Sequence, residues 1–460
     1  MTHLRNMLHT LKGRLGDLWW YTLILFVAQR VGDVVHAFTG LWLVPKYVPQ
    51  SELGAVLPLV SVGGMLGFPL IVLMMPFMKF LNKYMTQGEY GKVKRLLRDT
   101  FIATGVIFAV MLLVSRFLLP LVFERMRVED GSLSLLIVSS GIMVALVPIF
   151  LTALQSLKKF LVLSATTMLS SFVRFGTMVV CLPIRGLSGY FAGQIVHSLF
   201  LIGVALTALR KQFSRDIKMT AYWGDDWKPI LHYAKWPALL NFGGLLVVTT
   251  ESFVIRRCLP DIESAGYYMI SRFAEITLYF GASCVTILFP LISERYEQGK
   301  QDQQKVLAQS VLVTLALGVV FTAVIAPVTY LLFTHIPGWG DYSQFTPHLA
   351  ALSIVYAIRG SVNCFVMYQL ARNQFRFILF FVFIYFSEIV FLYCLTGYTF
   401  FALWLPPAWL DAMAAFNPCR LTVVLGVVLA YTIPTLLYAL VSMKKALAKG
   451  GVTANNDVVL

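Results

Sequence analysis

The chain has few charged side chains: Asp, Glu, Lys and Arg make up 13% of its 460 positions, whereas apolar residues make up 58%. Long apolar runs recur along the chain, and a soluble core would not need them. The runs are also longer than the strands of a transmembrane barrel. Only α-helices and closed barrels satisfy their backbone groups in lipid, so the composition predicts an all-α integral membrane protein.

Patterns for metal binding, secretion and nucleic-acid binding are missing too. The six cysteines are scattered without metal-type spacing, and we interpret them as small apolar fillers. The apolar run after Met1–Asp17 is long enough for a full span, which does not fit a cleaved signal. The formal net charge is +15, yet no basic soluble domain carries it. We therefore expect no metal, no cofactor and no nucleic-acid partner.

The apolar runs predict about twelve transmembrane helices, with short loops that make neighbouring helices antiparallel. We expect two six-helix lobes, residues 1–215 and 216–460. The expected spans are residues 18–44, 53–80, 98–123, 132–155, 160–182, 188–210, 230–257, 264–292, 304–333, 346–370, 376–396 and 420–443.

The two halves share a pattern. Residues 41–98 contain a helix end, a Pro-containing turn, a long apolar segment and a basic amphipathic stretch, and residues 252–310 repeat that order. Generic membrane turns resemble one another, so chance similarity is the alternative to two similar halves in one orientation; parallel repeats are a known transporter architecture. Six anchors recur 211–214 residues apart: Pro49/Pro260, Gly54/Gly266, Pro76/Pro290, Tyr84/Tyr296, Gly88/Gly299 and Lys94/Lys305.

The distribution of Lys and Arg predicts the orientation. With the expected spans, 25 of the 37 basic residues lie on the side of the N-terminus. Because cytoplasmic loops carry the excess of Lys and Arg, we expect both termini to be cytoplasmic. The same charge favours contact with anionic lipids of the inner leaflet.

Charged residues inside the expected spans are the most informative positions, since each costs about 2.5–3.5 kcal/mol to insert near a helix centre. Arg30/Asp33 and Arg272/Glu275 are spaced i,i+3, so the two side chains of each pair can meet on one helix face. Such a pair either neutralises its charges for structural reasons or has a functional role. The four arginines and four acids are Arg30, Arg174, Arg272 and Arg359, with Asp33, Glu251, Glu275 and Glu388.

Arg174 and Arg359 have no acid at i±3 or i±4. Each therefore needs a partner on another helix, a water-filled cavity or a ligand, and Glu388 is a candidate partner for either. Asp33, Glu275 and Glu388 are the candidates for binding a coupling H⁺ or Na⁺.

Other polar residues carry weaker signals. His36 and His197 are single histidines on apolar faces, which we interpret as satisfied bundle residues in place of ligands. Asp225 and Asp226 resemble paired acids that hold a metal-bound nucleotide sugar. They lie beside two tryptophans in a connector, however, and an interfacial amphipathic segment explains them better.

Two six-helix halves resemble the MOP superfamily of exporters, as do the Pro-x(4–5)-Gly turn before the second and eighth helices and the basic linker after each. That superfamily holds the MATE drug antiporters, the lipid II flippases and the polysaccharide-repeat-unit (Wzx-type) flippases. Twelve spans are similar to the first and last of these, whereas lipid II flippases typically have fourteen. The resemblance implies two lobes around a central cavity that opens alternately to each face, compatible with a monomer.

The flippase branch handles undecaprenyl-pyrophosphate-linked sugars. Arginines in the family's cavity are similar in kind to four residues of this chain, which are the candidate substrate-binding positions: Arg30, Arg174, Arg272 and Arg359.

The chemistry of the substrate separates the branches. A guanidinium binds phosphate through two donors and keeps its charge, whereas an exporter of organic cations needs carboxylates and aromatics. The two arginines without a local acid favour an anionic substrate. We expect a non-enzymatic flippase that moves a lipid-linked oligosaccharide across the bacterial inner membrane by alternating access.

Two alternatives stay open. One is a MATE-type cation-coupled drug antiporter. The other is a membrane glycosyltransferase or polysaccharide polymerase, which is less favoured because the longest outer loop, Gly397–Pro418, has a single acid, Asp411.

Overall fold

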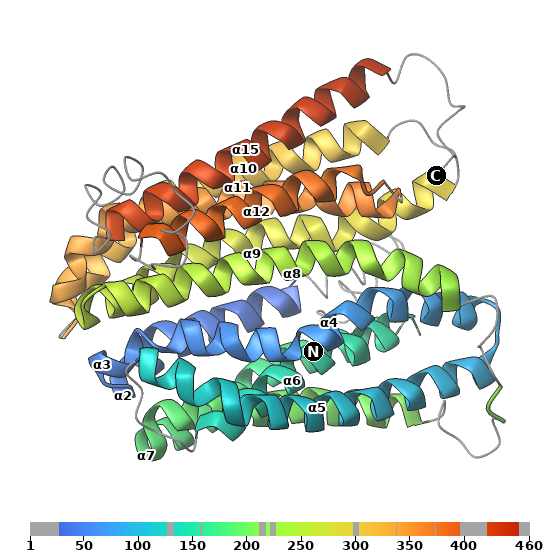
Figure 1. Ribbon diagram of the computed structural model, residues 1–460, viewed down its shortest axis with the longest axis horizontal. Coiled ribbons are helices and arrows are strands. Elements are labelled where there is room, and N and C mark those ends of the chain that lie inside the picture. Colours follow the sequence, from blue (N-terminus) through green and yellow to red (C-terminus); the bar gives the residue numbers. More distant parts are fainter. Residues whose placement is uncertain are drawn as a thin grey trace, which may run out of the picture. The chain divides into compact units, whose positions relative to one another are not determined.

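The computed structural model describes residues 27–126, 133–156, 159–210, 218–220, 227–297, 303–336, 338–372, 374–395 and 421–449. Every regular element within these residues is a helix (Figure 1). Nine of the described helical segments are long and apolar enough to cross a membrane. The prediction of an all-α membrane protein is confirmed. The acids Asp225 and Asp226 and the outer loop 397–418 lie outside the described residues.

The helices agree with the expected spans. Residues 27–38 are helical and continue into a π-helical turn, η1. The first expected span begins before the described residues, α9 covers the expected span 264–292, and α7 holds two spans, so about twelve spans fit the chain. The remaining elements are η1 (Thr39–Leu43), α2 (Val44–Tyr47), α3 (Gln50–Leu53), α4 (Val56–Thr86), α5 (Tyr90–Met126), α6 (Leu133–Ser156), α7 (Phe160–Leu209), α8 (Trp227–Cys258), α9 (Asp261–Glu297), α10 (Gln303–His335), η3 (Gly340–Phe345), α11 (Thr346–Ala371), α12 (Arg376–Leu395) and α15 (Leu421–Lys449).

The chain divides into two compact units, Met1–Leu245 and Leu246–Leu460. The division falls within α8, so the two units share this helix. The lobe boundary at 215/216 stays a prediction.

Each unit is built around one closely packed pair of helices. In the first unit α4 packs most extensively against α6, and in the second α9 packs most extensively against α11. These pairs correspond to the second and fourth helices of each expected half. Glycines allow the α4–α6 approach, because a Cβ added to Gly141 would collide with the backbone of Gly63. Small residues at helix crossings are the usual means of close packing in membranes.

The turn before α3, the short helix that leads into α4, recurs before α9. In both places a proline lies outside the helix while its carbonyl accepts the first helical hydrogen bond. The recurrence at a constant offset of 211 residues supports a duplicated unit. The bonds run from Val48 N–H to Val44 C=O (2.9 Å) and from Leu53 N–H to Pro49 C=O (2.9 Å), and then from Leu259 N–H to Ile255 C=O (3.1 Å) and from Ser264 N–H to Pro260 C=O (3.0 Å).

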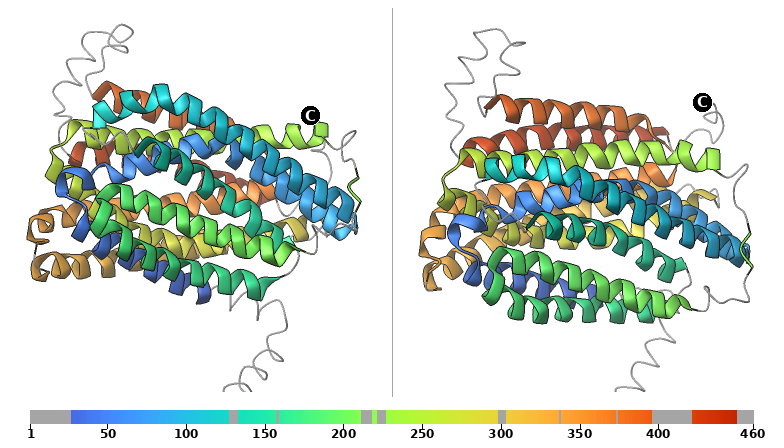
Figure 2. Two further views of the ribbon diagram at one scale, coloured as in Figure 1. Left: turned by 90° about the horizontal axis from the view of Figure 1, so that it is seen from below. Right: turned by 60° about the horizontal axis from the view of Figure 1, so that its bottom comes forward.

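The helix α7 reverses direction at Gly186. This residue has φ 49° and ψ −125°, a backbone conformation that glycine adopts without the steric cost of a side chain. Lys159 donates to the carbonyl of Ala208, so the beginning and end of α7 lie side by side. The element therefore consists of two antiparallel arms (green in Figure 2) that match the expected spans 160–182 and 188–210.

Candidate functional site

Two of the arginines predicted to meet an acid on their own helix do so. Arg30 Nη2 lies 3.0 Å from Asp33 Oδ2, and Arg272 Nη1 lies 2.8 Å from Glu275 Oε2. All four side chains are about one fifth to one quarter exposed. Each pair contains one positive and one negative side chain on the same helix face. The i,i+3 spacing is therefore enough to explain how the two charges neutralise each other in the membrane.

Arg359 lies between two acids from different helices of the second unit. Its Nη2 donates to Glu251 Oε1, and its Nη1 lies 3.4 Å from Glu251 Oε2. Glu388 Oε1 is 3.7 Å from the same Nη2. Glu251 comes from α8, Arg359 from α11 and Glu388 from α12. Both acids are nearly inaccessible, with exposed side-chain fractions of 4% and 3%.

This Glu251–Arg359–Glu388 cluster has one carboxylate more than it has guanidinium groups. If both acids are ionised, it carries one uncompensated negative charge, which is costly in a buried site. The Oε1 atom of Glu388 makes no hydrogen bond within the described residues. Tyr267 and Tyr356 lie within electrostatic range of Glu251 and Arg359. The arrangement can therefore accept a proton or a monovalent cation.

Arg174 has a different environment in the first unit. Its Nη1 lies 3.3 Å from His36 Nδ1, and its Nη2 lies 3.5 Å from the hydroxyl of Tyr190. A guanidinium only donates, so Nδ1 of His36 must be the unprotonated, accepting nitrogen. The other nitrogen, Nε2, then carries the proton and lies 3.2 Å from Ser171 Oγ. The ring of His197 meets His36 edge-on, 5.5 Å away.

Every contact described for Arg174 is with a neutral group. Within the described part of the chain no carboxylate forms an ion pair with it, and its buried Nε has no hydrogen-bond partner. Among Arg30, Arg174, Arg272 and Arg359, Arg174 is thus the one whose positive charge the described side chains leave uncompensated. Such a charge calls for water or an anion.

Two of these contacts, Glu251 with Arg359 and His36 with Arg174, were not predicted from the sequence. Glu251 was counted among the acids inside the spans but was not assigned to Arg359. Of the four acids considered inside the spans, Asp33 and Glu275 belong to the i,i+3 pairs. The other two, Glu251 and Glu388, lie in the same half as Arg359, so the sequence alone could have suggested them as its partners. The contact between His36 and Arg174 had no such signal, because the two residues are 138 positions apart and meet only through packing.

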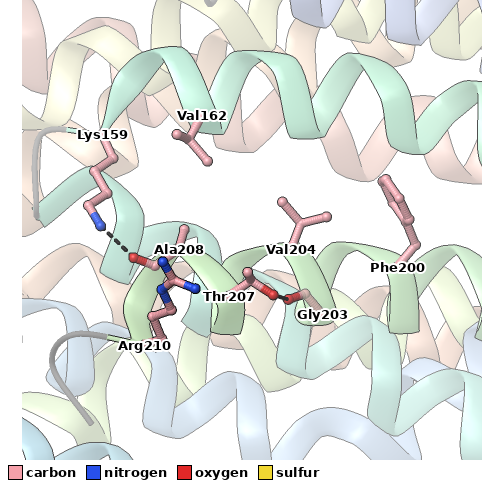
Figure 3. Close-up of a pocket in the computed structure, with 8 residues that line it drawn as sticks. All are labelled: Lys159, Val162, Phe200, Gly203, Val204, Thr207, Ala208 and Arg210. Carbon is pink, nitrogen blue, oxygen red and sulfur yellow. Dashed lines mark hydrogen bonds between the residues drawn. The ribbon is translucent and has the colours of Figure 1, made fainter. Parts of the chain in front are cut away.

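A cavity of about 890 Å³ lies between the two arms of α7. We call it the α7 groove. Figure 3 shows Lys159 and Arg210 at one end of it and Phe200 at the other. The residues that line it are Lys159, Val162, Phe200, Gly203, Val204, Thr207, Ala208 and Arg210.

The described residues contain no group of three or more His, Cys, Asp or Glu side chains arranged to hold a metal ion.

No protein-family model matches the sequence, and no curated protein matches it either. The fold, in contrast, has solved counterparts. An outward-facing multidrug resistance MATE family transporter of the MOP superfamily gives a TM-score of 0.64 at 10% identity, over 96% of this chain and 98% of that chain. An inward-facing MATE family transporter gives 0.62 at 11% identity, over 92% and 96%.

A MOP superfamily transporter from Pyrococcus furiosus gives a TM-score of 0.62 at 11% identity, over 95% of this chain and 98% of that chain. That protein is described as having a binding pocket of reverse polarity, which suggests a different function. The chain thus has the fold of multi-pass MATE transporters of the MOP superfamily. At these identities the likeness shows the fold alone, and the fold that the sequence resemblance implied is confirmed.

Proposed function

We propose that this protein is a transporter that moves an undecaprenyl-pyrophosphate-linked oligosaccharide across the bacterial inner membrane by alternating access. The observation that carries the proposal is the environment of Arg174, a guanidinium inside a spanning helix that has neutral partners only, within the described residues. The fold supports the transport mode, since solved proteins of this fold are transporters. One chain contains both halves, so a monomer suffices.

Arg174 is suited to hold a pyrophosphate. Its Nε has no hydrogen-bond partner in the described residues, and its contacts to His36 and Tyr190 are long, at 3.3 and 3.5 Å. A phosphate oxygen can replace these weak contacts with charge-assisted bonds, which are shorter and roughly twice as strong as neutral ones. His36 orients the guanidinium without competing for the anion, because its neutral ring accepts from Arg174. Arg30, Arg272 and Arg359 each have an acid beside them and are weaker candidates.

The Glu251–Arg359–Glu388 cluster is our candidate for energy coupling. Of the three acids that the sequence offers for H⁺ or Na⁺ binding, Asp33 and Glu275 each lie against an arginine of their own helix. Glu388 shares its arginine with Glu251. Gain or loss of one positive charge there changes the electrostatic balance of α8, α11 and α12 together, and a transporter can use that difference to favour one conformation.

A second candidate function is a MATE-type cation-coupled drug antiporter. The excess of carboxylate in the second unit favours it, because organic cations need acidic partners. The Pyrococcus protein supports keeping both candidates, since its description shows that pockets of this fold differ in polarity.

Transport in proteoliposomes tests the proposal. Two substrates are compared side by side, a pyrophosphate-linked oligosaccharide and a cationic drug. We expect Arg174→Ala to cut flipping of the first at least tenfold, and Arg174→Lys to restore it in part, because lysine keeps the charge but loses the planar fork of donors. Arg185→Ala is the matched control, an exposed arginine on the same helix. Full flipping by folded Arg174→Ala, or transport of the drug alone, would replace the proposal with the antiporter.

A further inference from the structure

The α7 groove combines an apolar wall with two cations at one end. We propose that it binds an anionic phospholipid of the bilayer, with the phosphate at Lys159 and Arg210 and an acyl chain along Val162, Val204 and Phe200. This site is independent of the transported substrate and of the proposed function. The occupant belongs to the leaflet on the side where α7 begins and ends.

The dimensions of the groove suit an acyl chain. Its volume of about 890 Å³ is near the upper end of the roughly 300–1,000 Å³ of pockets that take drug-sized molecules. From Arg210 to Phe200 the second arm advances about 15 Å at the usual helical rise. That length equals the depth of one leaflet, half of the roughly 30 Å hydrocarbon core. A chain that begins at the basic end therefore runs along the wall to the bilayer midplane.

The surface beside the groove is apolar as well. Leu161, next to Val162, is 54% exposed, and Leu199, next to Phe200, is 50% exposed. A Cβ added to Gly203 would meet no atom within 4 Å, so open space lies directly above the backbone there. A small soluble anion would leave this apolar space empty, whereas a lipid fills it. The surroundings thus favour a lipid over free phosphate.

The basic end has the donors for a phosphate. Lys159 uses one of its three N–H groups on the carbonyl of Ala208 and keeps two (Figure 3). Arg210 is exposed and contributes a second positive charge. None of the residues that line the groove is an acid. Basic pockets between transmembrane helices are the kind of site that binds anionic headgroups. A zwitterionic lipid, whose headgroup also carries a positive charge, should bind this basic end less tightly than an anionic lipid does.

Native mass spectrometry of the purified, delipidated protein tests the site with two probes, phosphatidylglycerol and phosphatidylcholine. We expect the wild type to retain phosphatidylglycerol more tightly. Lys159→Ala with Arg210→Ala should weaken that binding about 30-fold, which corresponds to about 1 kcal/mol for each of two cations near the membrane surface. The matched control is Arg376→Ala with Lys444→Ala, which removes two exposed cations outside the groove and should bind as the wild type does.

A second pair of variants tests the apolar wall. Gly203→Phe should fill the groove and reduce lipid retention at least tenfold. Gly176→Phe is the control, since an added Cβ there also meets no atom within 4 Å, and Gly176 does not line the groove. Equal retention of the two lipids by the wild type overturns the proposal, as does full retention by either groove variant. Inorganic phosphate that binds Gly203→Phe and the wild type equally would replace it with a simple anion site.

Discussion

Removal of Arg359 should destabilise the protein more than removal of Arg30, Arg174 or Arg272. Arg359→Ala leaves Glu251 and Glu388, with exposed fractions of 4% and 3%, without their cation. Loss of one member of a buried ion pair typically costs about 3–5 kcal/mol, because the remaining charge is buried and unpaired. Arg359 itself is 26% exposed, which allows water to reach the gap, so we expect the lower end of that range.

The two acids should differ in what they contribute. Glu251 meets both terminal nitrogens of Arg359, so Glu251→Gln should cost about 1.5–3 kcal/mol, the usual value of a hydrogen bond to a charged group. Glu388 lies 3.7 Å away and, when ionised, adds the excess negative charge. Glu388→Gln should therefore cost less than about 1 kcal/mol, or stabilise the protein slightly. Combining Arg359→Ala with Glu251→Gln should recover at least half of the loss seen for Arg359→Ala.

Unfolding in mixed micelles by increasing denaturing detergent, followed by tryptophan fluorescence, measures these differences. Arg30→Ala is the matched comparison, because Asp33 is 26% exposed and its unpaired charge can be solvated. The reasoning fails if Arg359→Ala and Arg30→Ala cost the same. It fails as well if Glu388→Gln is as damaging as Glu251→Gln, or if the double variant is no more stable than Arg359→Ala alone.

Three further predictions concern packing, the pair on the first helix and topology. Gly141→Leu should separate α4 from α6 and lower stability by at least about 1–3 kcal/mol, whereas Gly105→Ala, where a Cβ meets nothing within 4 Å, should not lower stability in the same detergent unfolding assay. Asp33→Asn should lower transport by removing the carboxylate that Arg30 contacts, and Asp33→Asn with Arg30→Gln should restore it; a double variant that has normal activity but no response to an ion gradient would instead assign coupling to Asp33. Reporter fusions should give cytoplasmic signals after Lys94, Lys158, Lys300 and Leu460 and outside signals near Pro49, Asp130, Pro260 and Asp341, and two or more fusions on the wrong side contradict the twelve-span topology.

Features with a local cause could be predicted from the sequence. The fold class followed from apolar runs, since lipid leaves a backbone few choices. Arg30 with Asp33 and Arg272 with Glu275 followed from helical spacing, which fixes which side chains share a face. The reversal within α7 was expected between residues 182 and 188, where Gly186 adopts its positive φ.

Features that depend on which helices become neighbours could not be predicted. Glu251 and Arg359 are 108 residues apart, and their contact requires α8 to pack beside α11. The neutral partners of Arg174 come from the first helix and from the second arm of α7. The α7 groove depends on the distance between the two arms of α7, and the hydrophobic pattern of the sequence gives no information about that distance. The sequence does not show which helices are neighbours. An arginine that meets an acid on another helix therefore cannot be distinguished in it from an arginine that meets none.

A duplication would account for the recurring turns but not for the charged residues. Turn hydrogen bonds recur 211 residues apart because prolines and backbone geometry fix them. At that offset the charged residues do not recur: Tyr385 lies 211 positions from Arg174, Pro148 from Arg359 and Gly40 from Glu251. The charged residues thus differ between the two units: Arg174 with its neutral partners lies in the first, and the Glu251–Arg359–Glu388 cluster, with one acid more than it has arginines, lies in the second. In the function proposed above, Arg174 serves the substrate and the cluster serves the driving ion, so each unit would hold one of the two sites. Variants of Arg174 should accordingly change which substrate is carried, whereas variants of Glu388 should change how transport responds to an ion gradient.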